Sequence, residues 1–143
     1  MYKRQVSEKS IKGLHILLAE DNELNMEIAE FVIQNEGASV TKAWNGQEAV
    51  EIFQKSRPDE FDVILMDIMM PVMNGYEAAK MIRTLDRDDA KTVPIIAMTA
   101  NAFTEDRLKS KESGMNEHIA KPIDAKLLVK VISEFVENKE EDS

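Results

Sequence analysis

The chain contains no cysteine, only five glycines and four prolines, and no apolar run long enough to cross a bilayer. The absence of cysteine excludes disulfide bridges and thiolate metal sites. A membrane-spanning helix needs about 20 consecutive apolar residues, so insertion of this segment into a membrane is excluded as well. The basic start Met1-Tyr-Lys-Arg-Gln lacks the apolar stretch of a signal peptide. We therefore expect a cytoplasmic location.

Positive charge is scarce too. Lys and Arg number 18 against 27 Asp and Glu, which gives a formal net charge of −9. Because nucleic-acid phosphates would be repelled on average, we expect no nucleic-acid binding by this domain. The remaining composition, 43% hydrophobic and 31% charged over 143 residues, is typical of one soluble globular domain.

Both ends of the chain are polar, and the residues between them show regular hydrophobic patterns. We predict a linker or tail over residues 1–12, a folded domain over 13–137 and a charged C-terminal tail over 138–143. Segments with helical spacing, such as the recurrence of Leu24, Ile28, Phe31 and Val32, alternate with short apolar runs. The runs of strand length are His15–Ala19, Ser39–Ala43, Val63–Asp67, Pro94–Thr99 and Glu117–Ala120.

Capping residues support this division. Asn22, Asn45 and Asn74 precede the first three helical segments, and Asp124 precedes the last. Strands and helices therefore alternate, which is typical of a parallel sheet covered by helices on both faces. We predict a flavodoxin-like, doubly wound α/β fold with a five-stranded parallel sheet, strand order 2-1-3-4-5, and five helices. The charged run from Asp86 to Asp89 is expected to be a solvated loop.

Side chains suited to one reaction follow the predicted strands. Glu20 and Asp21 follow the first strand, and Asp67 ends the third. In the predicted order these two strands are neighbours, so the three carboxylates should converge. Carboxylates in one cleft repel each other unless a cation intervenes, and oxygen ligands without His or Cys suit Mg²⁺ or Mn²⁺.

This set of residues suits phosphoryl transfer to a carboxylate. Asp67 would be the nucleophile, needing no general base because a carboxylate is already ionised at neutral pH. The metal and Lys121, after the fifth strand, would balance oxygen charge. Thr99, at the end of the fourth strand, would donate a hydrogen bond to a phosphoryl oxygen.

These residues lie within stretches that resemble a response-regulator receiver domain. The resemblance covers about residues 13–137, and it implies the CheY-like form of the fold and a role in two-component phosphorelay signal transduction. Such a domain catalyses its own phosphorylation and dephosphorylation. The Glu-Asp-Asn-x-x-Asn form at residue 20 is most similar to receivers of hybrid sensor histidine kinases. The matching stretches are LLAEDN (17–22), NGQEA (45–49), FDVILMDIMMPVMNGYEA (61–78), PIIAMTANAF (94–103) and GMNEHIAKPID (114–124).

The resemblance implies a catalytic and metal-binding role for five residues. Asp67 takes the phosphoryl group from a phosphohistidine. Glu20 and Asp21 hold Mg²⁺ together with Asp67 and the backbone carbonyl of Met69, and Asp21 is the direct side-chain ligand. Lys121 contacts the phosphoryl group, and the peptide bond that follows it is usually cis in the family.

The resemblance also implies switch residues and a partner. Thr99 follows the phosphoryl group, and the second switch position is His118, where the family often has Tyr or Phe. The expected partner is the dimerisation domain of a histidine kinase or a histidine phosphotransfer domain. Its predicted contacts are Asn25, Met26 and Ala29 on the first helix and Pro122 and Ile123 after the fifth strand.

Other functions fit the sequence less well. Aspartate-nucleophile phosphatases carry a second Asp two residues after the nucleophile, where this chain has Met69. A flavodoxin needs a Ser/Thr/Gly-rich phosphate loop after the first strand, but Glu20, Asp21 and Asn22 stand there. A pseudo-receiver that serves only as an interaction surface would not need the full acid, Thr and Lys set. A stand-alone response regulator that acts by docking is the alternative to a domain of a longer kinase.

Overall fold

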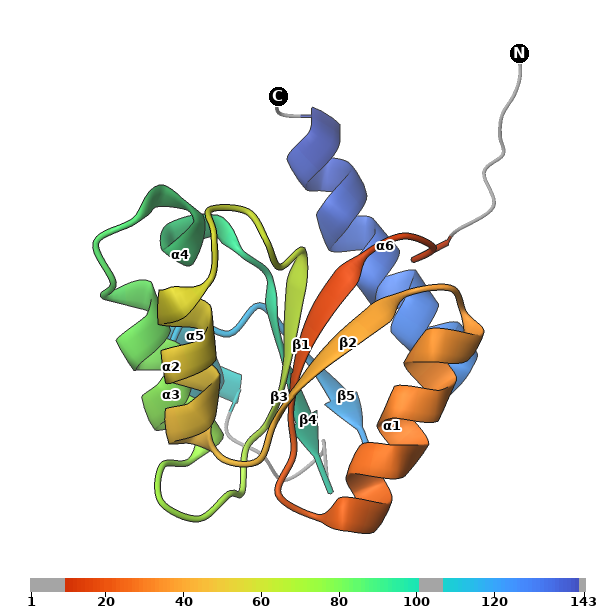
Figure 1. The fold of residues 1–143 in the computed structure, drawn as a ribbon, viewed down its shortest axis with the longest axis horizontal. Coiled ribbons are helices and arrows are strands. Elements are labelled where there is room, and N and C mark those ends of the chain that lie inside the picture. The colour runs from red at the N-terminus through yellow and green to blue at the C-terminus, as the bar shows by residue number, and fades with distance from the viewer. Residues whose placement is uncertain (1–9, 101–106, 142–143) are drawn as a thin grey trace.

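A parallel β-sheet forms the centre of the computed structural model, which describes residues 10–100 and 107–141 (Figure 1). Within these residues the strand order is β2-β1-β3-β4-β5. The predicted flavodoxin-like α/β fold and its strand order are confirmed, and only Pro94 falls outside its predicted strand. The strands are β1 His15–Ala19, β2 Ser39–Ala43, β3 Val63–Asp67, β4 Ile95–Thr99 and β5 Glu117–Ala120.

Helices cover both faces of the sheet (Figure 1). Helices α1 and α6 pack on one face, and α2 and α3 pack on the other. The predicted caps at the starts of α1, α2 and α3 are present, because each asparagine side chain accepts a hydrogen bond from the backbone N–H three residues later. The helices are α1 Glu23–Asn35, α2 Gly46–Lys55, α3 Gly75–Arg83, α4 Asp88–Thr92, α5 Arg107–Glu112 and α6 Ala125–Glu141.

The two faces of the sheet bury separate apolar clusters. Successive strand residues point to opposite faces, so Leu17 and Ile64 contact the α2–α3 side while Ile16 and Leu65 contact the α1–α6 side. Each such side chain stabilises the fold by roughly 1.5–3 kcal/mol. Burial on both faces explains why β1, β3 and β4 are continuous apolar runs. In the part of the chain that is described, none of the helices combines the length and apolar character needed to span a bilayer.

The charged run before β4 differs from the prediction. It forms a sixth helix within the described ranges, α4, where five helices and a solvated loop were expected. The Arg87 guanidinium forms two 2.7 Å bonds with Asp89, which is only 7% exposed, and it also donates to the Phe53 and Ser56 carbonyl oxygens. Asp89 in turn accepts a hydrogen bond from the Asp59 N–H. The charges alone predicted a solvated loop, but the Arg87–Asp89 ion pair and the hydrogen bonds of Arg87 attach this run to the end of α2.

Replacing Arg87 by alanine is expected to lower the free energy of unfolding by about 3 kcal/mol, because it leaves the buried Asp89 carboxylate unpaired. The hydrogen bond from Arg87 is the largest cause that lowers the pKa of Asp89, so this stabilisation is present above the ordinary carboxyl pKa and is lost as pH falls through the lowered value. Urea unfolding measures the effect. The control is Arg57→Ala, since that side chain is 89% exposed and 3.9 Å from Glu60. Equal losses in the two variants would contradict the assignment.

Candidate functional site

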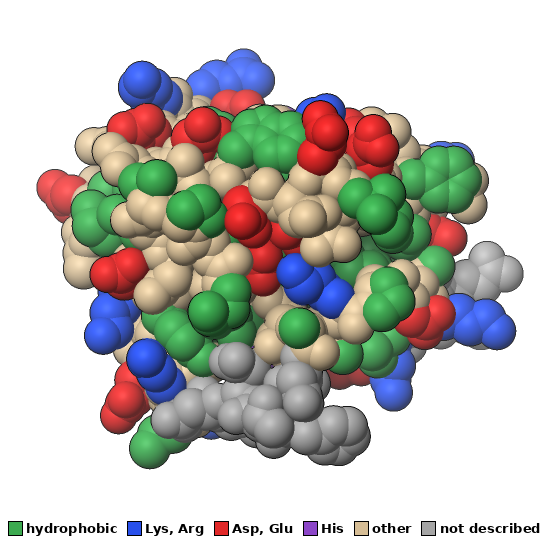
Figure 2. Space-filling view, turned by 90° about the horizontal axis from the view of Figure 1, so that it is seen from below, with side chains coloured by type: hydrophobic (Ala, Val, Ile, Leu, Met, Phe, Trp, Pro, Cys, Tyr) green, Lys and Arg blue, Asp and Glu red, His purple; other side chains and the backbone are tan. Residues whose placement is uncertain are grey.

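The carboxyl ends of the strands come together at one edge of the sheet. The parallel register sets Ala19 beside Met66, Asp67 beside Met98 and Thr99 beside Ala120. The residues that follow these strands therefore share one surface. Figure 2 shows this surface, with acidic side chains gathered near its centre, a basic side chain next to them and hydrophobic side chains around them.

Three carboxylates converge there. One oxygen from each of Glu20, Asp21 and Asp67 lies within 4.8 Å of the others. Glu20 is 1% exposed and Asp67 is 3% exposed, whereas Asp21 faces solvent. The predicted convergence is confirmed, although 46 positions separate the two aspartates in the sequence. Two buried acids and one exposed acid therefore meet at one point of this edge.

Lys121 joins the two buried acids. Its Nζ lies 3.1 Å from Glu20 Oε1 and 3.2 Å from Asp67 Oδ2. Glu20 Oε2 also accepts a hydrogen bond from the Asn22 N–H at 3.1 Å, which fixes that carboxylate at the start of α1. Burial lowers the pKa of Lys121, but the charges of Asp67 and Glu20 outweigh it and the net shift is upward. The lysine is therefore fully charged at neutral pH.

The surroundings of Asp67 shift its pKa upward. Burial, helped by the neighbouring Glu20 charge and opposed by Lys121, raises the pKa of Asp67 from 3.8 to about 7. The predicted repulsion among these carboxylates thus acts on Asp67 where no cation intervenes. A further positive charge beside Asp67 would favour its reactive form.

Without a divalent cation, stability should fall as pH rises from about 4 to about 7. In this window the folded chain keeps the proton on Asp67 that the unfolded chain has lost, and each unit of pKa difference is worth about 1.4 kcal/mol. The expected loss is a few kcal/mol, measured by urea unfolding at about pH 5 and pH 8 in the presence of EDTA. Asp67→Asn should remove this slope, whereas Asp88→Asn, which changes an exposed acid at the other end of the sheet, should keep it. A wild-type slope in Asp67→Asn would refute the assignment.

The loop after Asp67 turns sharply back to α3. The Gly75 N–H donates to the Ile68 carbonyl oxygen at 2.8 Å, and a Cβ at Gly75 would collide with the Asp67 carbonyl oxygen. This close approach explains why position 75 holds a glycine. Met69 lies in this loop with its side chain 75% exposed, two residues after the central carboxylate.

Thr99 and His118 lie on adjacent strands. Thr99 ends β4 and is 4% exposed, next to Ala120 in the register with β5. His118 is on β5, and its Nε2 lies 2.7 Å from the Ser110 hydroxyl of α5. Ser110 could not be predicted from the sequence, because no pattern distinguishes a serine in a short polar helix. His118 is thus connected to α5 and is not part of the acid cluster.

Two of the α1 residues predicted to contact a partner are buried. Met26 is 1% exposed and Ala29 is 3% exposed, and both pack into the core. Met26 therefore offers no surface to a partner, contrary to the expectation. The exposed apolar side chains are instead Leu24, Ile28 and Phe31, at 64%, 39% and 69%. Both sets have helical spacing, so periodicity alone could not tell them apart.

A shallow pocket lies between α1 and the segment after β5. The peptide bond between Lys121 and Pro122 is cis, as the resemblance implied. The pocket thus connects the buried acid cluster with the exposed side of α1. Its lining residues are Glu20, Asn25, Ile28, Ala29, Met98, Lys121, Pro122 and Ile123.

The comparisons with known proteins all point to one family. A family model described as the response regulator receiver domain matches residues 16–133. Histidine kinase 1 of Arabidopsis thaliana is 36% identical, over 88% of this chain and 13% of its own length. Hybrid signal transduction histidine kinase M of Dictyostelium discoideum is 41% identical, over 88% of this chain and 5% of its own length. The chain therefore spans only a small part of the histidine kinases that it matches.

Relatives of similar length exist as well. The polar-differentiation response regulator DivK of Brucella anthropi is 33% identical, over 85% of this chain and 94% of its own length. The solved receiver domain of the sensor histidine kinase PA1611 from Pseudomonas aeruginosa is 37% identical with a TM-score of 0.77, over 87% of this chain and 98% of that chain. That structure has a magnesium ion coordinated in its active site cleft.

Proposed function

The chain belongs to the response regulator receiver domain family of two-component systems, and on that premise we propose that Asp67 is its phosphoryl acceptor. The observation that carries the proposal is the meeting of three carboxylates and one lysine at a single point of the sheet edge. Asp67 is the central member, because it is buried beside Glu20 and contacts Lys121. The proposal thus assigns one residue as the acceptor and the others as its support.

The donor atoms fit a hard divalent cation. They are carboxylate oxygens within 4.8 Å of one another, with no sulfur or imidazole among them, and such ligands suit Mg²⁺ and, by the same chemistry, Mn²⁺. We assign Glu20, Asp21, Asp67 and the Met69 carbonyl to this cation, with Asp21 as the direct ligand from the exposed side. When bound, Mg²⁺ would neutralise the developing charge on a phosphoryl oxygen. Its positive charge would also favour the ionised form of Asp67.

The chain's own residues would then carry the transfer. An Asp67 carboxylate oxygen attacks phosphorus, a P–O bond forms, and the P–N bond of the donor phosphohistidine breaks, with the electron pair leaving on the imidazole nitrogen. Lys121 is held at the acceptor by Glu20 and would contact a phosphoryl oxygen. The Thr99 hydroxyl would donate a hydrogen bond to another phosphoryl oxygen. The product is an acyl phosphate on Asp67.

Thr99 and His118 are proposed to transmit the change. Thr99 ends β4 beside β5, so movement of its hydroxyl toward a phosphoryl group acts on both strands. The hydrogen bond between His118 and Ser110 connects β5 with α5, so breaking this bond would let α5 adopt a second packing. The phosphoryl group would shift the balance between these packings.

The partner is proposed to be a helical, histidine-bearing domain of a kinase or of a phosphotransfer protein. Apolar side chains suit such a helix, and Ile28 and Ile123 line the pocket beside Lys121. Asn25 and Pro122 complete this face, and Ala29 forms its floor. The face opens next to Asp67, so a docked histidine would reach the acceptor.

The similar proteins suggest two possible contexts for this domain, a longer kinase and a stand-alone regulator. The histidine kinases that match are much longer than this chain, which favours a receiver belonging to a hybrid sensor kinase. The match to nearly the full length of DivK favours the alternative, a stand-alone response regulator that acts by docking. We propose the hybrid-kinase context, because several histidine kinases are 34–41% identical to this chain, against 33% for DivK.

Phosphotransfer from purified phosphorylated histidine domains tests the proposed function. Intact-mass spectrometry should show one added phosphoryl group in the presence of Mg²⁺ and none in the presence of EDTA. Acetyl phosphate serves as a donor that needs no docking face, so it separates acceptor chemistry from partner recognition. Absence of labelling by any donor with Mg²⁺ present would refute the proposal.

A further inference from the structure

The β3–α3 loop contains a strained turn close to the proposed acceptor. Val72 has a φ of 68°, in the left-handed region that β-branched residues rarely adopt. The Met73 N–H donates to the Pro71 carbonyl oxygen at 2.7 Å, so Val72 is the central residue of a γ-turn of the rare positive-φ type. A strained backbone of this kind persists only where surrounding contacts hold it.

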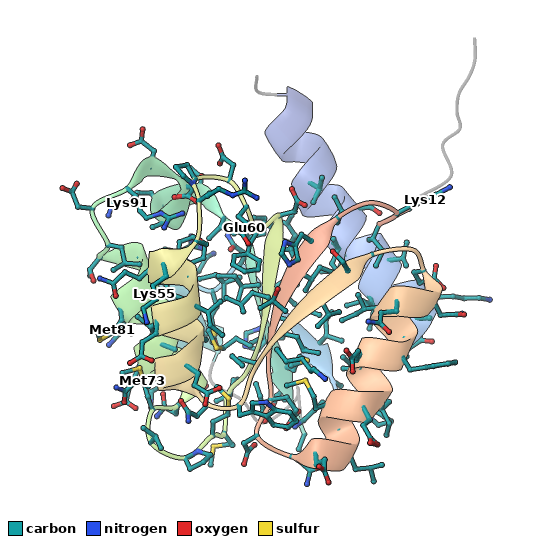
Figure 3. The ribbon with its side chains drawn as sticks, viewed as in Figure 1. Lys12, Lys55, Glu60, Met73, Met81 and Lys91 are labelled. Atoms are coloured by element: carbon teal, nitrogen blue, oxygen red, sulfur yellow. The ribbon has the colours of Figure 1, made fainter. Side chains whose placement is uncertain are left out.

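The N-terminal end of α2 supplies one such contact. The Gly46 N–H donates to the Met73 carbonyl oxygen at 3.0 Å, and Gly46 is buried. A Cβ at this position would collide with the same carbonyl oxygen, so the approach requires glycine. Figure 3 shows Met73 beside the N-terminal end of α2. The strained loop is therefore held from outside by α2.

The same short segment also contacts the other acid-bearing loop. The Ala43 carbonyl oxygen, at the end of β2, accepts a hydrogen bond from the Glu20 N–H at 3.0 Å. The segment between these two contacts is itself fixed, because Asn45 accepts from the Glu48 N–H at 2.8 Å and Glu48 accepts from the Trp44 N–H at 2.9 Å. Residues 43–46 thus hold the loop after β1 and the loop after β3 at once.

We propose that residues 43–46 position the metal site, with Gly46 as the positioning residue. Glu20 and Asp21 lie in the loop after β1, whereas Asp67 ends β3 and Met69 lies in the loop that follows it. By contacting both loops, the segment sets the distance between these two pairs of residues. This inference rests on the proposed function, because it concerns affinity for the cation assigned to that site. Mg²⁺ tolerates little departure from octahedral geometry, so a small displacement of one loop lowers its affinity.

Gly46→Ala tests the inference against a matched glycine variant. The control is Gly37→Ala, which also strains the backbone at a φ of 89° but lies beyond the end of α1, at the amino edge of the sheet. Calorimetric titration should show Mg²⁺ affinity about tenfold weaker in Gly46→Ala and unchanged in Gly37→Ala, as expected when a supporting contact of a metal site is lost. Equal Mg²⁺ affinity in wild type and Gly46→Ala would overturn the inference, and Asp67 labelling of the wild type would show that the proposed function stands.

A second measurement uses only the wild-type chain and applies even where Gly46→Ala does not fold. Linkage requires that a contact which strengthens Mg²⁺ binding is itself stabilised by bound Mg²⁺. Saturating Mg²⁺ should therefore slow hydrogen exchange at the Gly46 amide more than at the Gly13 amide. The Gly13 N–H donates to the Gly37 carbonyl oxygen at the opposite edge of the sheet. Equal slowing of both amides would indicate a global effect and would overturn the inference. Failure of the wild type to bind Mg²⁺ at all would instead refute the proposed function.

Discussion

Replacing Asp67 by asparagine is expected to abolish phosphoryl uptake. The asparagine amide lacks the anionic oxygen that forms the bond to phosphorus, so no acyl phosphate can form at this position. Glu20 cannot substitute for it, because that carboxylate is 1% exposed and already pairs with Lys121 and the Asn22 N–H. Labelling by acetyl phosphate with Mg²⁺ should fall by at least about 10³-fold, to the background of the assay.

Asp88→Asn is the control for this experiment. It removes one exposed acid at the start of α4, on the amino edge of the sheet, and leaves the acid cluster intact. Its labelling should equal that of the wild type. Labelling of Asp67→Asn at a wild-type rate would mean that another residue accepts the group, and the proposed site would be wrong.

Replacing Lys121 by alanine is expected to slow transfer by about 10²–10³-fold, the usual effect of removing one preorganised charge from a transition state. The Nζ lies 3.1 Å from Glu20 and 3.2 Å from Asp67, where it would contact a phosphoryl oxygen. Mg²⁺ affinity should stay equal or increase, since the variant removes a cation that competes for the same carboxylates. Single-turnover labelling and calorimetric titration measure the two effects separately.

Slower transfer without a loss of Mg²⁺ affinity distinguishes a catalytic role from a folding defect. A merely disrupted site would lose both transfer and Mg²⁺ affinity. Lys126→Ala is the control, because that lysine is exposed on α6 and should leave both quantities unchanged. Wild-type transfer in Lys121→Ala would contradict the role assigned to this side chain.

The sequence could predict the strands and the acid cluster for one physical reason. Strands buried on both faces leave continuous apolar runs, and the polar residue that ends each run marks the carboxyl edge of the sheet. Asp67 and Thr99 each end such a run and Lys121 follows the fifth predicted strand, so the strand order alone brought all three to one edge. Their joint location therefore needed no knowledge of side-chain contacts.

The remaining features depend on contacts that periodicity does not contain. On α1, Leu24 and Ile28 have the spacing of a core stripe, but Met26 and Ala29 are the residues that the sheet covers. The Arg87 and Asp89 charges suggested solvent, but their mutual pairing permits burial. The ionisation of Asp67 depends on the depth of burial and on the distance to Glu20, and neither can be derived from the sequence.

Chemical identification of the modified residue tests the central claim most directly. Borohydride reduces an acyl phosphate to an alcohol, so reduction of the phosphorylated chain and peptide mapping should find homoserine at position 67, only when Mg²⁺ is present during labelling. A reduced carboxyl at another position, or a phosphoryl group that resists reduction on a serine or threonine, would contradict the account.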